Sequence, residues 1–246
     1  MMDPGRLLPE TRRLWERLRQ EPLLKGFVLV GGTALTLRIG HRISEDLDFA
    51  FLGDSLPRRR LQLLAARLGE EGMTLEPIQD VAAAEEFIDA GLELDDFQQN
   101  SLAHLPEGQV KLSFVRFGNE LTTLLNGNAD SPVRVATLDE VFRMKVLACA
   151  DRSKTRDWFD LFVLMTRHGF DGADFRRVFA EAGRESGFDI ANARLRKGVP
   201  SIADEGYASL LENPPSLEEM RAFFTEMLDR LEVDLSAAAF RSRPAL

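Results

Sequence analysis

The sequence predicts an α/β fold of the α+β kind, in which a small mixed sheet with helices packed on it is followed by a helical C-terminal part. Three observations predict this arrangement. Residues 27–51 have the pattern of a strand, a glycine turn, a short helix and a returning strand. The first half of residues 109–117 alternates apolar and polar side chains, and apolar residues recur at helical spacing from Thr137 onward. We therefore expect one unit over residues 1–136 and a helical unit over residues 137–246.

The composition is that of a soluble globular chain: of 246 residues, 44% are hydrophobic and 29% are charged. No apolar stretch has the length of a signal-peptide core or a membrane span, so we expect a cytoplasmic protein with no membrane association. The single cysteine, Cys149, lies in an apolar helical pattern and is expected to be a buried, inert thiol. The three histidines are too far apart for a zinc site.

The net charge of −9 argues against a broad basic surface for nucleic acid and fits a small substrate or a basic partner. The chain nevertheless has local basic runs at residues 58–60 and 152–156, and such a patch could still bind the end of an RNA.

The central stretch of the chain, residues 27–51, reads FVLVGGTALTLRIGHRISEDLDFAF. Residues 27–30 form an apolar, β-branched run of the kind that a buried strand uses. Two glycines then allow a turn, and we expect Thr33 to cap the helix that follows, with Gly40 at its end. Free N–H groups at the start of a helix favour an anion, and phosphate is the natural guest.

The returning strand carries Asp46 and Asp48, which a period of two places on the same face, while Leu47 and Phe49 face a core. Mg²⁺ prefers oxygen ligands and leaves several positions for substrate phosphates. Two carboxylates beside a phosphate-binding helix start therefore predict a Mg²⁺-dependent phosphate site. The competing interpretation is a solvated acidic strand next to an ordinary strand–helix turn.

The same rules assign the rest of the chain. Two capping boxes, Thr137 to Glu140 and Ser216 to Glu219, mark helix starts. We expect helices near residues 10–20, 57–68, 81–87, 137–150, 158–169, 174–182, 191–197 and 217–232, and strands near residues 73–78, 92–97 and 109–117. The strand over 109–117 is expected to lie beside the strand over 46–51.

The residues Val30-Gly31-Gly32, thirteen intervening positions and Asp46-Leu47-Asp48 resemble the signature hG[GS]…Dh[DE]h of the polymerase-β-type nucleotidyltransferase superfamily. The fuller string GGTALTLRIGHRISEDLDF resembles the AbiEii/AbiGii toxin family within that superfamily. The resemblance implies a polymerase-β-like core, with Asp46 and Asp48 as catalytic ligands of Mg²⁺. It also implies nucleotide binding by Gly31, Gly32, Thr33, Arg42 and Ser44.

A second stretch, KVLACADRSKTRDWFDL at residues 145–161, resembles a further block of the same family. The matching positions are Lys145, Arg152, Lys154, Arg156, Asp157 and Asp160. The resemblance implies that Lys145 and Asp157 are catalytic and that Arg156 binds nucleotide. The active cleft is then expected between the two parts of the chain, with the glycines and Asp46 and Asp48 on one wall and Lys145 and Asp157 on the other.

The chemistry of this second block fits that role. Lys145 and an arginine could neutralise the β- and γ-phosphates of a nucleotide as pyrophosphate leaves. Asp157 could orient Lys145 or accept a proton from the incoming hydroxyl. The alternative is a set of ion pairs between helices on a solvated face.

One residue departs from the family pattern. The superfamily takes a third carboxylate from the strand over 109–117, and Ser113 stands at that position. Three explanations remain open: another acid reaches in, one metal works with a different base, or the site has degenerated. The candidate acids are Glu76, Glu93, Asp95 and Asp96.

The resemblance implies a nucleotidyltransferase that moves NMP from a Mg²⁺-bound NTP to a hydroxyl, acting as the toxin of a toxin–antitoxin (abortive infection) system. It implies an RNA acceptor such as tRNA and a cognate antitoxin protein. The first alternative is a degenerate member that binds nucleotide or a protein partner without catalysis. The second is a transferase for a small-molecule hydroxyl.

Overall fold

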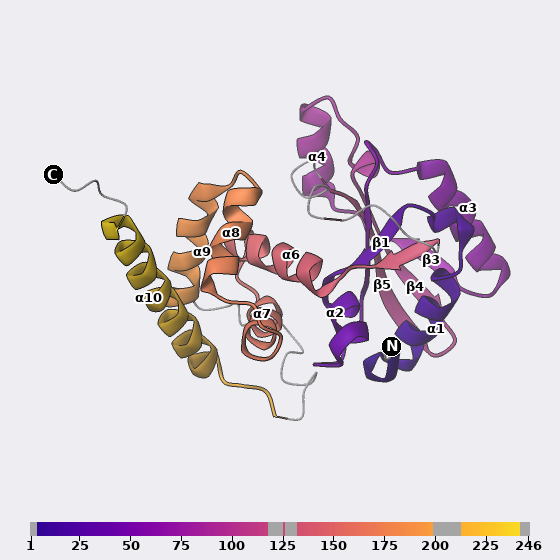
Figure 1. Ribbon diagram of the computed structural model, residues 1–246. Coiled ribbons are helices and arrows are strands. Elements are labelled where there is room, and N and C mark those ends of the chain that lie inside the picture. Colours follow the sequence, from indigo (N-terminus) through magenta and orange to yellow (C-terminus); the bar gives the residue numbers. More distant parts are fainter. Residues whose placement is uncertain (1–3, 118–124, 126–131, 199–212, 242–246) are drawn as a thin grey trace. The chain divides into compact units, whose positions relative to one another are not determined.

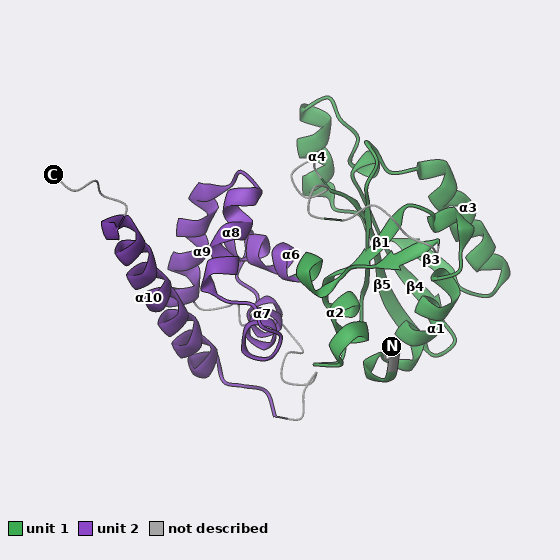
Figure 2. Ribbon diagram, viewed as in Figure 1, with its two compact units in different colours: residues 1–141 green, residues 142–246 purple. Residues whose placement is uncertain are grey.

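The computed structural model of the chain describes residues 4–117, 125, 132–198 and 213–241 (Figure 1). The chain divides into two compact units, Met1–Val141 and Phe142–Leu246 (Figure 2). The boundary falls inside one helix, α6 (Leu138–Asp151), whereas the sequence placed it between residues 136 and 137. The N-terminal unit contains the sheet, and the C-terminal unit is helical.

The N-terminal unit is built on a six-stranded mixed sheet with strand order β3-β4-β5-β2-β1-β6. Its strands are β1 (Phe27–Val30), β2 (Leu47–Phe51), β3 (Thr74–Pro77), β4 (Gln98–Leu105), β5 (Gly108–Arg116) and β6 (Val133–Val135). β1 pairs with β2 in antiparallel and with β6 in parallel orientation, and β2 pairs in parallel with β5. The sheet confirms the predicted fold class, and it confirms that the strand over 109–117 lies beside the strand over 46–51, since β5 pairs with β2.

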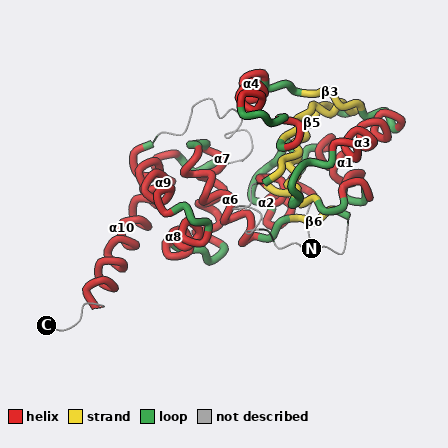
Figure 3. Tube along the Cα trace, turned by 90° about the horizontal axis from the view of Figure 1, so that it is seen from above, coloured by secondary structure: helices red, strands yellow, loops and turns green. Residues whose placement is uncertain are grey.

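One face of the sheet forms the core of this unit. The register places Phe27, Phe49 and Phe114 on that face, and their rings contact one another. Helix α1 (Pro9–Leu18) covers them through Trp15, whose ring lies 6.4 Å from that of Phe49. Helix α3 (Arg58–Glu70) adds Leu61, Leu64 and Leu68, all buried. Helix α2 (Gly31–Ile39) lies against β1 and β2 on the opposite face (Figures 1 and 3).

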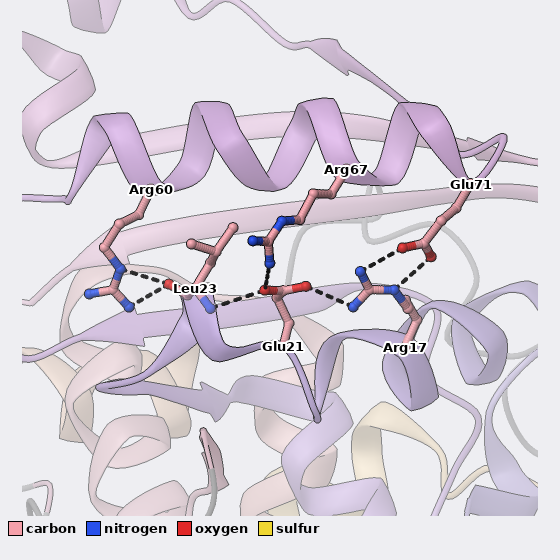
Figure 4. Close-up of polar contacts among 6 residues, drawn as sticks. All are labelled: Arg17, Glu21, Leu23, Arg60, Arg67 and Glu71. Carbon is pink, nitrogen blue, oxygen red and sulfur yellow. Dashed lines mark hydrogen bonds and ion pairs between the residues drawn. The ribbon is translucent and has the colours of Figure 1, made fainter.

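The buried carboxylate of Glu21 links α1 and α3, because it binds an arginine from each of these helices (Figure 4). Glu21 is 2% exposed and accepts hydrogen bonds from Arg17 (2.9 Å), Arg67 (2.9 Å) and the backbone N–H of Leu23 (3.1 Å). Burial raises the pKa of Glu21, but the Leu23 N–H and the Arg17 guanidinium outweigh it, so that the pKa lies below its ordinary value. The Glu21 carboxylate therefore accepts hydrogen bonds from three donors, one on α1, one in the segment between α1 and β1, and one on α3.

The structure corrects the sequence prediction between residues 92 and 105. The segment expected to be a strand at 92–97 contains a short 3-10 helix, η3 (Leu94–Asp96), and the strand β4 follows it. The sequence missed β4 because its first three residues, Gln98, Gln99 and Asn100, have low strand propensity, and pairing with β5 overrides that propensity. It also missed β6.

The described residues of the C-terminal unit form helices and the connections between them, as the sequence predicted. The helices are α6, α7 (Thr155–Arg167), α8 (Gly172–Glu181), α9 (Glu185–Lys197) and α10 (Leu217–Arg241). Both predicted capping boxes form: Glu140 N–H donates to Thr137 Oγ1 (3.2 Å), and Glu219 N–H donates to Ser216 Oγ (3.1 Å).

Cys149 is 1% exposed, as expected, and burial raises the pKa of its thiol. Helix α10 continues to Arg241 instead of ending near residue 232. Among the described residues, no helix combines the length and apolar character needed to cross a bilayer.

Candidate active site

The candidate site of the N-terminal unit begins where β1 passes directly into α2. Gly31, the first residue of the helix, has φ +70°, a conformation that side chains other than glycine rarely adopt. A Cβ on Gly31 would lie 2.8 Å from Oδ2 of Asp48 on the neighbouring strand. Glycine is therefore needed here twice, for the backbone turn and for the close approach of the Asp48 carboxylate to the helix start.

A layer of buried polar side chains supports this helix start. Thr33, Arg42 and Ser44 are 2%, 3% and 6% exposed. Thr33 Oγ1 lies 2.8 Å from Ser44 Oγ and also bonds to the carbonyl oxygen of Asp46. A Cβ on Gly32 would collide with the Arg42 guanidinium and lie 3.3 Å from Ser44 Oγ. Arg42 and Ser44 thus pack against Gly32 and Thr33 in the first turn of α2, although about ten residues separate the two pairs in the sequence.

The expected role of Thr33 as a helix cap is wrong. The helix starts three residues earlier than predicted, with Val30 at the N-cap position, and Val30 has no polar side chain to satisfy the first N–H groups. Thr33 instead lies within the first turn, and its hydroxyl fixes the chain that leads to Asp46. The predicted helix end at Gly40 is confirmed, with φ +58°.

Asp46 directly precedes β2, Asp48 is the second residue of that strand, and both are partly exposed. The intervening Leu47 and the following Phe49 are completely buried on the core side. This alternation is the one that the sequence predicted, and it directs the two carboxylates to the face opposite the core. Asp48 is in register with Val30 on β1 and with Ser113 on β5.

Ser113 occupies the expected position of the third carboxylate. It is 5% exposed and stands in register between Asp48 on β2 and Asn100 on β4. Three of the four acids considered as substitutes have partners elsewhere. Glu76 bonds to His104 (2.8 Å), and Arg58 bonds to both Glu93 (2.5 Å) and Asp96 (2.7 Å).

The described residues contain no group of three or more His, Cys, Asp or Glu side chains placed to hold a metal ion. The donor set at β2 is thus a pair of carboxylates. Mg²⁺ commonly binds proteins through one or two carboxylates, with waters and substrate phosphates completing its octahedral shell. Asp46 and Asp48 fit that requirement, because both are partly exposed and the Asp48 carboxylate approaches the backbone of Gly31 at the start of α2.

The C-terminal unit brings together the second set of predicted residues. Lys145 on α6 is 7% exposed, and its Nζ lies 2.6 Å from Asp157 Oδ1 and 2.6 Å from Asp160 Oδ2, both on α7. Arg152 Nε lies 2.8 Å from Asp157 Oδ2 at the edge of the cluster, with its side chain 53% exposed. Asp157 and Asp160 are 2% and 0% exposed.

This cluster links two helices, as one interpretation of the sequence expected, but it is buried instead of solvated. Burial raises the pKa of Asp157, yet the Lys145 ammonium and the Arg152 guanidinium outweigh burial and lower the pKa to about 2. Asp157 is therefore ionised at neutral pH and is a weak proton acceptor. Its geometry suits it to hold the Lys145 ammonium in place.

The remaining predicted residue, Arg156, lies on α7 directly before Asp157 and is partly exposed. The basic run at residues 58–60 does not form a free cationic surface. Arg58 is paired with two acids, and Arg60 donates to the carbonyl oxygens of Leu23 and Lys25. The two clusters lie in different units, and the cleft expected between them stays a prediction.

Sequence reasoning left two neighbours of the predicted residues out of the proposed sites. Asp160 forms the second ion pair of Lys145. Its spacing of three residues from Asp157 places both carboxylates on one face of a helix, and this spacing is the sequence signal for its role. Asn100 flanks Ser113, but no local pattern marks it, because its position depends on the pairing of β4 with β5.

The comparisons with known proteins agree with this architecture. The family model described as "Nucleotidyl transferase AbiEii toxin, Type IV TA system" matches residues 13–243. The chain belongs to this family of nucleotidyltransferase toxins from type IV toxin–antitoxin systems. It is also similar to an uncharacterized protein of Aquifex aeolicus (strain VF5), with 25% identity over 219 residues that cover 89% of this chain and 94% of the relative.

Proposed function

We propose that this protein transfers NMP from an NTP to a hydroxyl group of an acceptor, with RNA, such as the end of a tRNA, as the first acceptor to test. The observation that carries the proposal is the approach of the Asp48 carboxylate to the backbone of Gly31 at the uncapped start of α2. That arrangement puts a metal-binding carboxylate beside N–H groups that favour phosphate. Asp46 supplies the second carboxylate.

In the proposed reaction, the acceptor hydroxyl oxygen forms a bond to the α-phosphorus. The bond from that phosphorus to the oxygen bridging to the β-phosphorus breaks, pyrophosphate leaves, and the hydroxyl proton is released. The N–H groups at the start of α2 bind phosphate oxygens, while Thr33, Arg42 and Ser44 hold that helix start in place. Asp46 and Asp48 would hold Mg²⁺, which would supply positive charge to the phosphate groups.

Lys145, in this proposal, neutralises charge on the departing phosphates, with Arg156 as a further cation. We assign Asp157 and Asp160 to positioning, because two carboxylates fix the Lys145 ammonium at 2.6 Å and Asp157 has a pKa of about 2. Such a carboxylate would be a poor general base at neutral pH.

The test is transfer of label from each of the four α-labelled NTPs to total tRNA with Mg²⁺, alongside release of pyrophosphate. The variant Asp46→Asn/Asp48→Asn should lose both signals. The matched control Asp54→Asn changes an exposed acid three residues beyond β2 and should retain them. Pyrophosphate release without labelled RNA would redirect the search to a small-molecule or protein acceptor, and identical activity in the β2 variant and the control would exclude the assigned site.

Ser113 favours one alternative, a family member that binds nucleotide or a protein partner without transfer. It is buried in register beside Asp48, where a hydroxyl supplies no negative charge for a second metal ion. Under this alternative, the wild-type protein binds Mg²⁺-NTP in a titration but releases no pyrophosphate with any nucleotide.

Ser113→Asp separates the two functions, since it restores a carboxylate at that position. If the site is degenerate, the variant should gain pyrophosphate release that wild type lacks. If the site is active with two carboxylates, wild type releases pyrophosphate without the substitution. Ser113→Asn is the matched control, because it has a similar size without the charge.

As a member of a toxin family of type IV systems, the protein is proposed to have a cognate antitoxin and to act on growth. Expression of wild type and of Asp46→Asn/Asp48→Asn from the same promoter tests this. Growth arrest should require the two carboxylates, and equal arrest by both proteins would contradict toxicity through transfer.

A further inference from the structure

The N-terminal unit contains a groove with a volume of about 740 Å³ between α4 (Val81–Asp89) and the first half of β4. The groove is lined by residues 77–80 before α4, by α4 itself, by residues 93–95 and by residues 98–101 of β4. Strand β3 ends at Pro77, opposite Ser101, so the first residues of β4 continue along the groove beyond that strand. Figures 1 and 3 show α4 standing apart from the other labelled helices of its unit.

The groove exposes apolar side chains that nothing in the described chain covers. No residue of α4 is buried, although an amphipathic helix on a domain normally buries its apolar side. Val81 and Ile88 on α4 are 62% and 67% exposed, and Ile78 beside them is 44% exposed. All three line the groove. A cluster of exposed apolar residues around a groove is typical of an interaction site.

The charge of the groove is one-sided. Its lining contains Asp80, Glu85, Glu93 and Asp95 but no lysine or arginine. Residues 71–110, which include the whole lining, hold ten of the forty acidic residues of the chain and none of the thirty-one basic ones. The rest of the chain has thirty acidic and thirty-one basic residues, so the excess negative charge of the chain arises from this segment, four of whose ten acids line the groove. Arginines offset part of the charge of this segment: Arg58 pairs with Glu93 and Asp96, Arg17 with Glu71, and Arg13 with Glu107.

We propose that this groove docks a segment of a partner protein that carries both lysine or arginine and apolar side chains. Its apolar residues would cover Ile78, Val81 and Ile88, and its cations would face the exposed carboxylates of Glu85 and Asp95. Nucleic acid is disfavoured, since its phosphates would meet only negative charge. A twofold contact with a second copy would place the same acidic lining against itself.

The groove lies on the sheet near the candidate transfer site. Asn100, which lines the groove, is in register with Ser113, and Ser113 is in register with Asp48. With about 5 Å between neighbouring strands, a docked segment would lie roughly 10 Å from Asp48 along the sheet. Docking at the groove requires no turnover, so its test is independent of the proposed transfer activity.

The test uses the full-length protein and a short fluorescein-labelled peptide in which leucines recur at helical spacing among lysines and alanines, followed by fluorescence anisotropy. Glu85→Gln/Asp95→Asn should weaken binding about three- to tenfold at low salt and less at high salt. Ile88→Ser should weaken it at least about threefold at both salt concentrations. The matched controls are Glu16→Gln/Glu70→Gln and Leu63→Ser, which change exposed acids and an exposed leucine elsewhere on the same unit.

Affinity losses confined to the groove variants would support the proposal. Absence of saturable peptide binding, or equal losses in the control variants, would overturn it. Competition by an oligoadenylate RNA that the groove variants abolish would assign the groove to nucleic acid instead. A dimer that Ile88→Ser dissociates, measured by light scattering, would assign it to a second copy of the chain.

Discussion

Two clusters of charged residues carry the family resemblance, and they are built in opposite ways. At the start of β2, Asp46 and Asp48 are partly exposed beside the backbone of Gly31. In the C-terminal unit, Lys145 is enclosed with Asp157 and Asp160, and each of its two ion pairs measures 2.6 Å. The first pair of carboxylates is partly exposed, whereas the second set of charges is buried and its members pair with one another. The difference in burial and pairing is why we propose a binding role for the carboxylates of the first family block and a positioning role for those of the second.

The largest effect that this comparison predicts concerns Asp48. Asp48→Asn should lower the rate of NMP transfer about 10⁴-fold, because the variant loses the charge that we propose binds the metal beside the helix start. The expected change in unfolding free energy is smaller than this change in activation free energy. Initial rates with α-labelled NTP and urea unfolding of the same preparation measure the two effects. A variant that unfolds but keeps its rate per folded molecule would break the comparison.

In the buried cluster, substitutions should change the unfolding free energy strongly. Asp157→Asn leaves the buried Lys145 ammonium with one carboxylate fewer and should lower the unfolding free energy by about 3 to 5 kcal/mol. Arg152→Gln removes a half-exposed partner of the same carboxylate and should cost less than about 1 kcal/mol. Urea denaturation of the three proteins provides the comparison, and equal losses in both variants would contradict the distinction between the buried and exposed partners.

Acid should weaken the protein through the buried cluster. The pKa of Asp157 falls from its ordinary 3.8 to about 2 on folding, so its contribution to stability is complete above about pH 4 and is lost as the pH falls toward 2. The contribution is about 2 kcal/mol. Urea unfolding of wild type and of Asp157→Asn from pH 5 to about pH 2 should show a steeper decline for wild type. Parallel declines would exclude Asp157 as the titrating group.

A smaller effect is expected at Gly31. Gly31→Ala should lower the unfolding free energy by about 1 to 2 kcal/mol, because φ is +70° and the new Cβ would lie 2.8 Å from Asp48 Oδ2. Gly69→Ala is the matched control: it lies within α3 with no atom within 4 Å of the added Cβ, and alanine there should stabilise the helix by up to about 1 kcal/mol. Thermal unfolding of both variants measures the contrast. A neutral Gly31→Ala would show that the helix start can relax.

Much of the candidate site could be predicted from the sequence because its determinants are local. The path from Phe27 to Phe51 is contiguous, and the glycine turn, the end of α2 at Gly40 and the alternation at β2 each depend on a few adjacent residues. Both capping boxes were predictable for the same reason. The role of Thr33 was misjudged because the helix starts at Gly31 and Ser44, eleven positions away, binds its hydroxyl.

Only the tertiary structure decided how distant residues meet. It set the register that places Ser113 between Asp48 and Asn100, because strand pairing depends on both partners at once. It enclosed Lys145 between Asp157 and Asp160, where helical spacing alone allowed a solvated face. It also left α4 exposed above an acidic groove, since burial is a property of the whole chain and not of a segment. The sequence by itself determined the local structure of residues 27–51, because that structure depends on adjacent residues. Long-range packing determined which charges are buried and paired and which are partly exposed.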